Sequence, residues 1–148
     1  MHERSRHVWA PRVRRVGRLF GRHLTRHAGP ERQTGGSEEF ALQCVRDGER
    51  QILAARGQLD LASAWQLERE LRRAEATDAS EILVDLGGLE FIDAAGIEVV
   101  IHANARTRLN RKRLMIMRAP PDVHRSFELS GLVSRLPFVE RRAGVPLP

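Results

Sequence analysis

The sequence is poor in the residues that build disulfide frameworks and aromatic binding surfaces. It holds one cysteine, Cys44, and no tyrosine, and aromatic residues make up only 5% of its 148 residues. A single cysteine excludes a disulfide within the chain and argues against a zinc site built on thiolates. Proteins that stack bases need aromatic side chains gathered on one face. No nucleic-acid partner is therefore expected.

The sequence also lacks the long apolar runs that membrane segments need. No stretch approaches the roughly 20 apolar residues of a membrane-spanning helix, and no apolar signal-peptide core follows the N-terminal charges. The expected location is therefore the cytoplasm. Hydrophobic residues still make up 41% of the chain. A core is thus expected, filled by aliphatic side chains.

Positive charge is concentrated at the N-terminus. The formal net charge is +6, but residues 1–36 alone have a balance of +7, and the remainder is close to neutral. The breaker residues Gly29-Pro30 and Gly35-Gly36 close this basic segment. We predict a flexible tail and linker over 1–36, a folded domain over 37–142 and a C-terminal tail over 143–148.

Part of the tail has the pattern of an amphipathic helix. Val13, Val16, Phe20 and Leu24 recur at spacings of three and four residues, and arginines occupy many of the other positions. A basic helix of this kind can lie on an anionic membrane or dock on an acidic partner. Because short isolated helices are marginal in water, the alternative is a solvated extension without fixed structure.

From Phe40 onward the pattern alternates between strands and helices. Strands are predicted at 40–45, 51–55, 81–86, 112–117 and 136–139, and helices from 60 to about 76, from 93 onward and from 120 to 131. The order predicts an α/β domain with a mostly parallel mixed β-sheet of about five strands and helices packed against it. Gly87-Gly88 is expected to break the third strand, and Asp85 to lie at its end facing the loop. The predicted buried stripe of the first helix is Ala64, Leu67, Leu71 and Ala74.

The most informative segment covers residues 86–97. A buried strand is followed by a loop that delivers Asp93 to the N-cap of a helix, and the small residues Ala94, Ala95 and Gly96 leave the start of that helix open. Free N–H groups at a helix N-terminus suit an anion or a carboxylate, and the crevice beyond strand ends is a usual binding region. The alternative is that Asp93 only caps the helix and the small residues only permit close packing.

Three motifs in this order resemble the STAS family. The string Phe-Ile-Asp-Ala-Ala-Gly-Ile at 91–97 resembles the family's Phe-hydrophobic-Asp-Ser-Ser-Gly-Leu, and Gly-Gln-Leu-Asp at 57–60 resembles its Gly-Glu-Leu-Asp. Phe127, followed by Ser-Gly-Leu at 130–132, resembles a third family motif. The resemblance covers about residues 38–140 and implies a STAS-like fold.

The resemblance also implies a function and a partner. Bacterial STAS proteins of the anti-sigma factor antagonist type bind an anti-sigma factor, commonly a kinase of the histidine-kinase-like ATPase fold, and so release a sigma factor. The kinase switches such proteins off by phosphorylating the Ser or Thr directly after the motif's Asp. Ala94 occupies that position here and Ala95 follows, so neither can accept a phosphoryl group. The expected partner-binding residues are Asp60, Asp93, Ala94, Ala95 and Gly96.

Two other function classes remain open. Some STAS-like domains are structural subunits, either on the ATPase of an ABC lipid-transport system or in a stress-sensing assembly. The second class, an enzyme, is not expected, because the sequence offers no nucleophile–base pair, no phosphate-binding loop and no metal cluster. His23 and His27 are spaced as a metal pair but lack a nearby carboxylate, and His102 and His124 are expected to be surface or capping residues. No cofactor and no metal are therefore expected.

Overall fold

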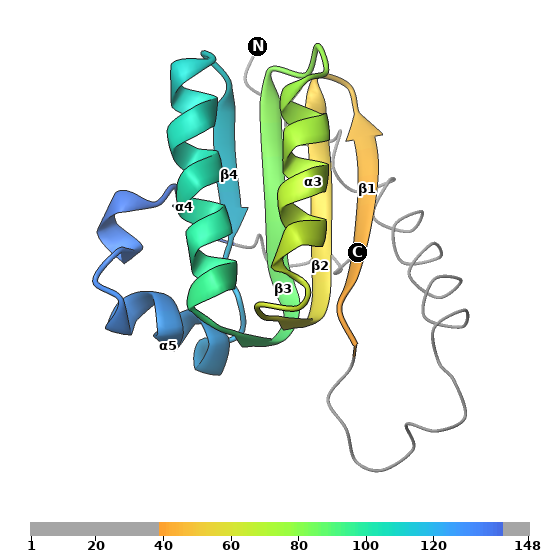
Figure 1. The fold of residues 1–148 in the computed structure, drawn as a ribbon. Helices are drawn as coiled ribbons and strands as arrows, with labels where there is room; N and C mark the ends of the chain where they lie inside the picture. The colour runs from red at the N-terminus through yellow and green to blue at the C-terminus, as the bar shows by residue number, and fades with distance from the viewer. Residues whose placement is uncertain (1–38, 141–148) are drawn as a thin grey trace, which may run out of the picture.

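The computed structural model describes residues 39–140, and Figure 1 shows how their elements are arranged. The predicted N-terminal tail with its amphipathic pattern, and the predicted C-terminal tail, lie outside the described residues. The elements in chain order are β1 (Ala41–Asp47), β2 (Arg50–Leu59), α3 (Ala64–Glu75), β3 (Glu81–Ile92), α4 (Ala94–Leu109), β4 (Arg113–Met117), α5 (Pro121–Leu129), a 3-10 turn η1 (Val133–Arg135) and β5 (Phe138–Val139).

The five strands form one sheet in the order β1-β2-β3-β4-β5. The hairpin partners β1 and β2 are antiparallel, whereas the β2–β3, β3–β4 and β4–β5 pairs are parallel. Each parallel pair is joined by a crossover that contains a helix, as parallel connections require. The prediction of a mostly parallel five-stranded α/β domain is thus confirmed.

The described helices pack on a single face of the sheet. Figure 1 shows α3 and α4 side by side in front of the strands, with α5 beside α4. The apolar stripe predicted for the first helix is the one that α3 buries, and α5 contributes Val123 and Phe127 to the same core. The largest fully buried side chains are Phe127, Leu53, Leu59, Leu67, Leu71, Ile82, Leu86, Leu89, Ile116 and Val84.

The third strand is longer than the sequence predicts. Gly87-Gly88 does not break it, since β3 continues to Ile92 and its last residues pair with β2 as far as Leu59. The register shifts twice along this pair, which is the signature of β-bulges. A Cβ on Gly88 would lie 2.9 Å from the Ala55 carbonyl oxygen. This glycine therefore permits a close approach of two strands and does not end one.

Two side chains lie elsewhere than expected. Asp85 is not at a strand end but in the middle of β3, 2% exposed, where its Oδ1 accepts a hydrogen bond from the Gly87 amide at 2.8 Å. His124 is not at the surface: it is 4% exposed, and its ring meets Phe138 edge-on at 4.7 Å between centroids. Both are exceptions to the tendency of such side chains to stay exposed.

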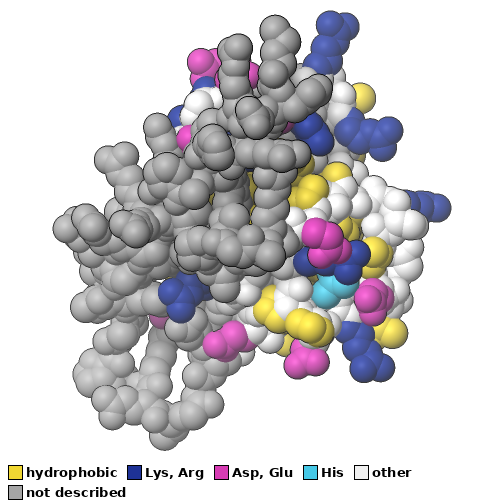
Figure 2. All heavy atoms as spheres, turned by 180° about the vertical axis from the view of Figure 1, so that it is seen from behind, with side chains coloured by type: hydrophobic (Ala, Val, Ile, Leu, Met, Phe, Trp, Pro, Cys, Tyr) yellow, Lys and Arg dark blue, Asp and Glu magenta, His cyan; other side chains and the backbone are white. Residues whose placement is uncertain are grey.

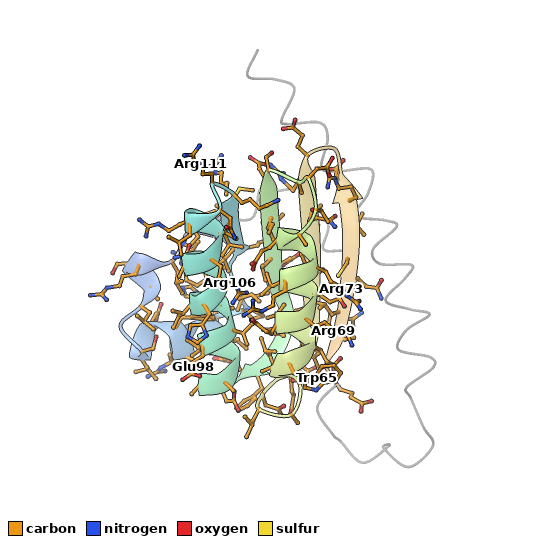
Figure 3. The ribbon with its side chains drawn as sticks, turned by 45° about the horizontal axis from the view of Figure 1, so that its top comes forward. Trp65, Arg69, Arg73, Glu98, Arg106 and Arg111 are labelled. Carbon is orange, nitrogen blue, oxygen red and sulfur yellow. The ribbon has the colours of Figure 1, made fainter. Side chains whose placement is uncertain are left out.

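An ion-pair cluster joins the two central helices. Arg106 on α4 donates to both carboxylate oxygens of Glu75 on α3, at 2.9 and 3.0 Å, and its Nη1 lies 3.0 Å from Glu68. Figure 3 shows Arg106 between the two helices. Hydrogen bonding to Glu75 raises the pKa of Arg106 above its ordinary value. The cluster joins the C-terminal part of α4 to α3.

Candidate partner-binding surface

Two loops meet at the end of the sheet where the parallel strands finish. One joins β2 to α3 and the other joins β3 to α4, and their positions are tied by the pairing of Leu59 with Ile92. The Asp93 amide also donates to the Leu59 carbonyl at 3.1 Å. The segments at 57–60 and 91–97, which lie far apart in the sequence, thus form one surface at the N-termini of α3 and α4. Trp65 and Glu98, labelled in Figure 3, mark these two helix starts.

The Asp93 carboxylate holds the two loops together. Its Oδ1 accepts a hydrogen bond from the Gly96 amide at 3.1 Å, which makes Asp93 the N-cap of α4. Its Oδ2 accepts one from the Leu61 amide, in the other loop, at 3.0 Å. The predicted capping role is confirmed. The bridge to Leu61 was not predicted, since spacing along a sequence does not show which loops meet.

Asp60 shapes the first loop in a similar way. Its Oδ1 accepts hydrogen bonds from the Ala62 and Ser63 amides, at 3.0 and 3.2 Å. The Ser63 hydroxyl donates to the Gln58 carbonyl at 2.8 Å. Asp60 thus accepts backbone N–H groups in a turn that precedes α3. The helix itself begins only at Ala64, later than the predicted start at residue 60.

The three small residues after Asp93 differ in exposure. Ala94 is exposed at the first position of α4, Ala95 is half-buried and Gly96 is buried. A Cβ on Gly96 would come within 2.9 Å of the Leu59 carbonyl oxygen and 2.8 Å of an Ile92 side-chain carbon. Gly96 is thus required by close packing under the loop, and Ala94 is the member of this group that faces solvent.

Three large apolar side chains lie exposed around these loops. Leu61 is 79% exposed, Trp65 56% and Phe91 46%. Arg69 lies over the Trp65 ring, 5.0 Å from its centroid. Aromatic side chains that are exposed beside small and polar residues are typical of protein-binding surfaces. We call Asp60, Leu61, Trp65, Phe91, Asp93 and Ala94 the loop surface.

Three members of the loop surface were missed in the sequence. Leu61 and Trp65 lie within the helix predicted from residue 60, and Phe91 was noted only as part of a motif. A signal was available: Trp65 lies next to Ala64, which is in the buried stripe of α3, and is therefore off that stripe. A large aromatic residue outside the buried face of its helix is an indicator of a binding role.

The described residues show neither a metal cluster nor a membrane helix. Within 39–140, no group of three or more His, Cys, Asp or Glu side chains is arranged to hold an ion. No helix in the same range is long and apolar enough to cross a bilayer.

Comparison with known sequences places this fold and these motifs in a family. Residues 42–139 match the family model described as "Mlab, STAS domain". The chain belongs to the STAS domain family. A relative from Bordetella bronchiseptica, named "Putative anti-sigma factor antagonist BtrV", is 32% identical over 91 residues, which is 62% of this chain and 78% of the relative.

Solved structures agree on the fold. The anti-sigma factor antagonist SpoIIAA in its unphosphorylated form matches with a TM-score of 0.59 and 21% identity, over 71% of this chain and 90% of its own. An anti-sigma factor antagonist from Mycobacterium paratuberculosis matches with a TM-score of 0.59 and 18% identity, over 68% and 85% of the two chains. The described residues therefore have the same fold as these two antagonists.

Proposed function

We propose that this STAS domain binds an anti-sigma factor through the loop surface and thereby releases a sigma factor. The named relative is an antagonist of this class. The observation that carries the proposal is the fixed geometry at the strand ends, where Asp93 joins two loops and Leu61, Trp65 and Phe91 are exposed beside it. Such a surface offers apolar anchors with a polar rim, as protein interfaces do.

In this proposal, partner binding is regulated differently from that of STAS antagonists that are phosphorylated. The side chain directly after Asp93 is the methyl group of Ala94, exposed at the first position of α4. A phosphoryl group cannot be attached there, so the charge of about −2 that a phosphoserine adds never forms at this point. Binding is then governed by the amounts of the two proteins and not by a kinase acting on this residue.

A second function has one observation in its favour. The matching family model carries the description "Mlab", and an interface without a switchable hydroxyl equally suits a subunit that stays bound. In this alternative, the domain is a structural subunit on the ATPase of an ABC lipid-transport system or in a stress-sensing assembly, and the loop surface contacts a permanent neighbour.

Affinity capture with the full chain separates the two functions. The chain carries a tag at one end, and proteins bound from source-cell lysate are identified by mass spectrometry, with a Trp65→Ala, Phe91→Ala double variant as control. Recovery of an anti-sigma factor of the ATPase fold by the native chain, and its loss with the double variant, is the expected result. Recovery of transporter or stress-assembly subunits would replace the proposal by the second function.

A further inference from the structure

A row of three exposed side chains leads from the loop surface along the outer side of α3. Trp65, Arg69 and Arg73 follow one another at intervals of four residues, so they lie on one face of the helix. This face is turned away from the buried stripe of α3, and Figure 3 shows the three side chains in sequence along the helix. Because Trp65 also belongs to the loop surface, the two surfaces are continuous. We call Trp65, Arg69 and Arg73 the α3 row.

The two arginines of the α3 row are held in place by their neighbours. The guanidinium carbon of Arg69 lies over the Trp65 ring, 5.0 Å from its centroid, and its Nε donates to the Glu70 carboxylate at 3.1 Å. Arg73 donates to the same carboxylate oxygen at 2.8 Å. Side chains that are already ordered lose less conformational freedom when a partner binds. The α3 row is therefore a preformed surface.

The charge that α3 presents to solvent is positive. The helix is formally neutral, since it holds three arginines and three glutamates. The side chains of Arg69 and Arg73 are 50% and 67% exposed, whereas that of Glu70 is only 18% exposed. Arg72 is likewise more exposed than its partner Glu68. In each pair the carboxylate lies closer to the domain, so an approaching molecule meets guanidinium groups first.

The side of the domain opposite the helices differs from the α3 row. Figure 2 views that side, and basic, acidic and hydrophobic side chains are interspersed over the described residues visible there. The α3 row instead places an aromatic ring and two guanidinium groups in one line, next to the exposed apolar residues of the loop surface. Trp and Arg are enriched at the positions that contribute most to protein binding. The α3 row is therefore suited to contact with a protein.

We propose that the protein bound by the loop surface also contacts the α3 row, and that it does so through an acidic surface. This inference rests on the proposed function, because it describes the partner of the same site. Asp or Glu side chains of the partner pair with Arg69 and Arg73, since a guanidinium group can donate two hydrogen bonds to one carboxylate. An apolar part of the partner packs on Trp65.

The size of the loop surface supports this extended contact. Stable protein interfaces involve about 20–30 residues on each side, and the loop surface is much smaller than this. Its continuation from Trp65 to Arg73 adds about 12 Å along α3. The partner of the loop surface therefore needs a neighbouring area to bind, and the α3 row provides one.

A protein fits the combined surface better than a membrane or a nucleic acid does. The loop surface carries the carboxylates of Asp60 and Asp93, and Glu98 is exposed at the nearby start of α4. An anionic membrane or a nucleic acid presents phosphate groups throughout, so these carboxylates would repel it where the loops meet. A folded protein can place acidic side chains opposite the arginines and other groups opposite the carboxylates.

The association rate tests the inference. The probe is the protein that the full native chain captures and that the Trp65→Ala, Phe91→Ala variant loses. Arg69→Gln combined with Arg73→Gln removes two positive charges and keeps good helix formers. This variant is expected to associate at least about fivefold more slowly at low salt, with a smaller difference at high salt. A rate equal to that of the native chain would overturn the inference.

Arg108→Gln combined with Arg111→Gln is the matched control. It removes the same charge at exposed positions, and Figure 3 shows Arg111 at the other end of the domain from Trp65. The control is expected to associate as fast as the native chain. Equal slowing by both double variants would show that only the net charge matters and would contradict a contact at the α3 row.

Zero-length cross-linking detects the acidic groups of the partner. The chain contains one lysine, Lys112, whose ammonium group donates to the carbonyl oxygens of Thr77 and Ala79. Arg73→Lys adds an amine on the α3 row, and a carbodiimide joins an amine to a carboxyl group as an amide, with loss of water. An amide between residue 73 and an Asp or Glu of the bound partner is expected, and none from residue 111 in Arg111→Lys. The reverse pattern would count against the inference.

The outcomes separate this inference from the proposed function. If an anti-sigma factor is captured and binds the Arg69, Arg73 variant as fast as the native chain, the inference fails and the proposed function stands. If the captured protein is of another class and associates more slowly with the variant, only the proposed function fails. If no captured protein depends on Trp65 and Phe91, both are wrong. Binding of phosphatidylserine vesicles or double-stranded DNA that requires Arg69 and Arg73, with unchanged protein association, also overturns the inference.

Discussion

Asp93 is the residue on which the geometry of the loop surface depends. One oxygen caps α4 through Gly96, and the other holds the neighbouring loop through Leu61. The cap was predictable from the sequence, because an Asp before small residues and a helical pattern is a known N-cap signal. The bridge was not, because it depends on the pairing of β2 with β3 beyond the two glycines.

Replacing Asp93 separates these two roles. Asp93→Ala removes both hydrogen bonds and is expected to lower the free energy of unfolding by about 1–2 kcal/mol. Asn caps helices as well as Asp does, so Asp93→Asn is expected to cost less while still weakening the hold on Leu61. Hydrogen exchange at the Leu61 amide checks this: it should be faster in Asp93→Ala. An unchanged rate would show that the bridge does not order the loop.

The one thiol of the chain is expected to be unreactive. Cys44 lies at the surface of β1, but its Sγ approaches Glu70 on α3 at 3.7 Å. Burial of the thiol group against the helix, together with the Glu70 carboxylate, raises the pKa of Cys44 to about 12. A raised pKa means less thiolate at pH 8, and the thiolate is the reactive form. Alkylation at pH 8 is expected to be at least about tenfold slower than for an unperturbed thiol.

The Glu70→Gln variant is the control for this prediction. It removes the negative charge beside the thiol, lowers the pKa of Cys44 and is expected to speed alkylation. A rate equal to that of a free thiol in the unmodified protein would contradict the account of this residue.

Among the elements, α3 and α4 are held at a fixed distance by Arg106. The Glu75 side chain is only 8% exposed, so removal of Arg106 leaves a nearly buried carboxylate without its cation. Arg106→Ala is expected to destabilise the domain by about 3 kcal/mol, near the range for broken buried pairs. Arg72→Ala removes an exposed partner of Glu68 and is expected to cost at most about 1 kcal/mol. Equal losses in denaturant unfolding would show that Arg106 does not clamp the helices.

The contact between α5 and β5 contains His124, which was expected to be a surface or capping residue. Neither ring nitrogen of His124 has a hydrogen-bond partner among the described residues, while Phe127 and Phe138 lie against the ring. His124→Leu is expected to leave the stability unchanged or to raise it by about 1 kcal/mol, since a buried polar group without a partner is costly. A loss of more than about 2 kcal/mol in thermal unfolding would show that the ring is needed for packing.

These elements show which features of the fold the sequence alone predicts and which it does not. Alternating apolar patterns and caps indicated each strand and helix between 40 and 140, because these signals are local. The continuation of β3 through Gly87-Gly88 depends on pairing with β2, and the burial of His124 depends on where Phe138 lies. Both are set by contacts between distant segments, which a local pattern does not contain.

For the whole molecule, the placement of the site follows the architecture. The two STAS-like strings at 57–60 and 91–97 come together because β2 and β3 are parallel neighbours and end at the same edge of the sheet. Asp60, Asp93, Ala94 and Ala95 share that edge, with Gly96 packed beneath them. Of the exposed apolar residues that complete the loop surface, Trp65 could be suspected from its position off the buried stripe of α3, whereas the exposure of Leu61 and Phe91 was visible only in the structure.

The central claim is that the loop surface binds an anti-sigma factor and is not switched off by phosphorylation. Titration calorimetry with the captured anti-sigma factor tests it directly, with the full native chain, Ala94→Asp and Ala105→Asp, which places the same change at another exposed position of α4. An acidic residue at the start of a helix does not destabilise it, so Ala94→Asp is expected to fold normally and to bind at least about tenfold more weakly. The native chain, with or without ATP, and Ala105→Asp are expected to bind equally well. Unchanged affinity in Ala94→Asp, or loss of native binding upon addition of ATP, would contradict the account.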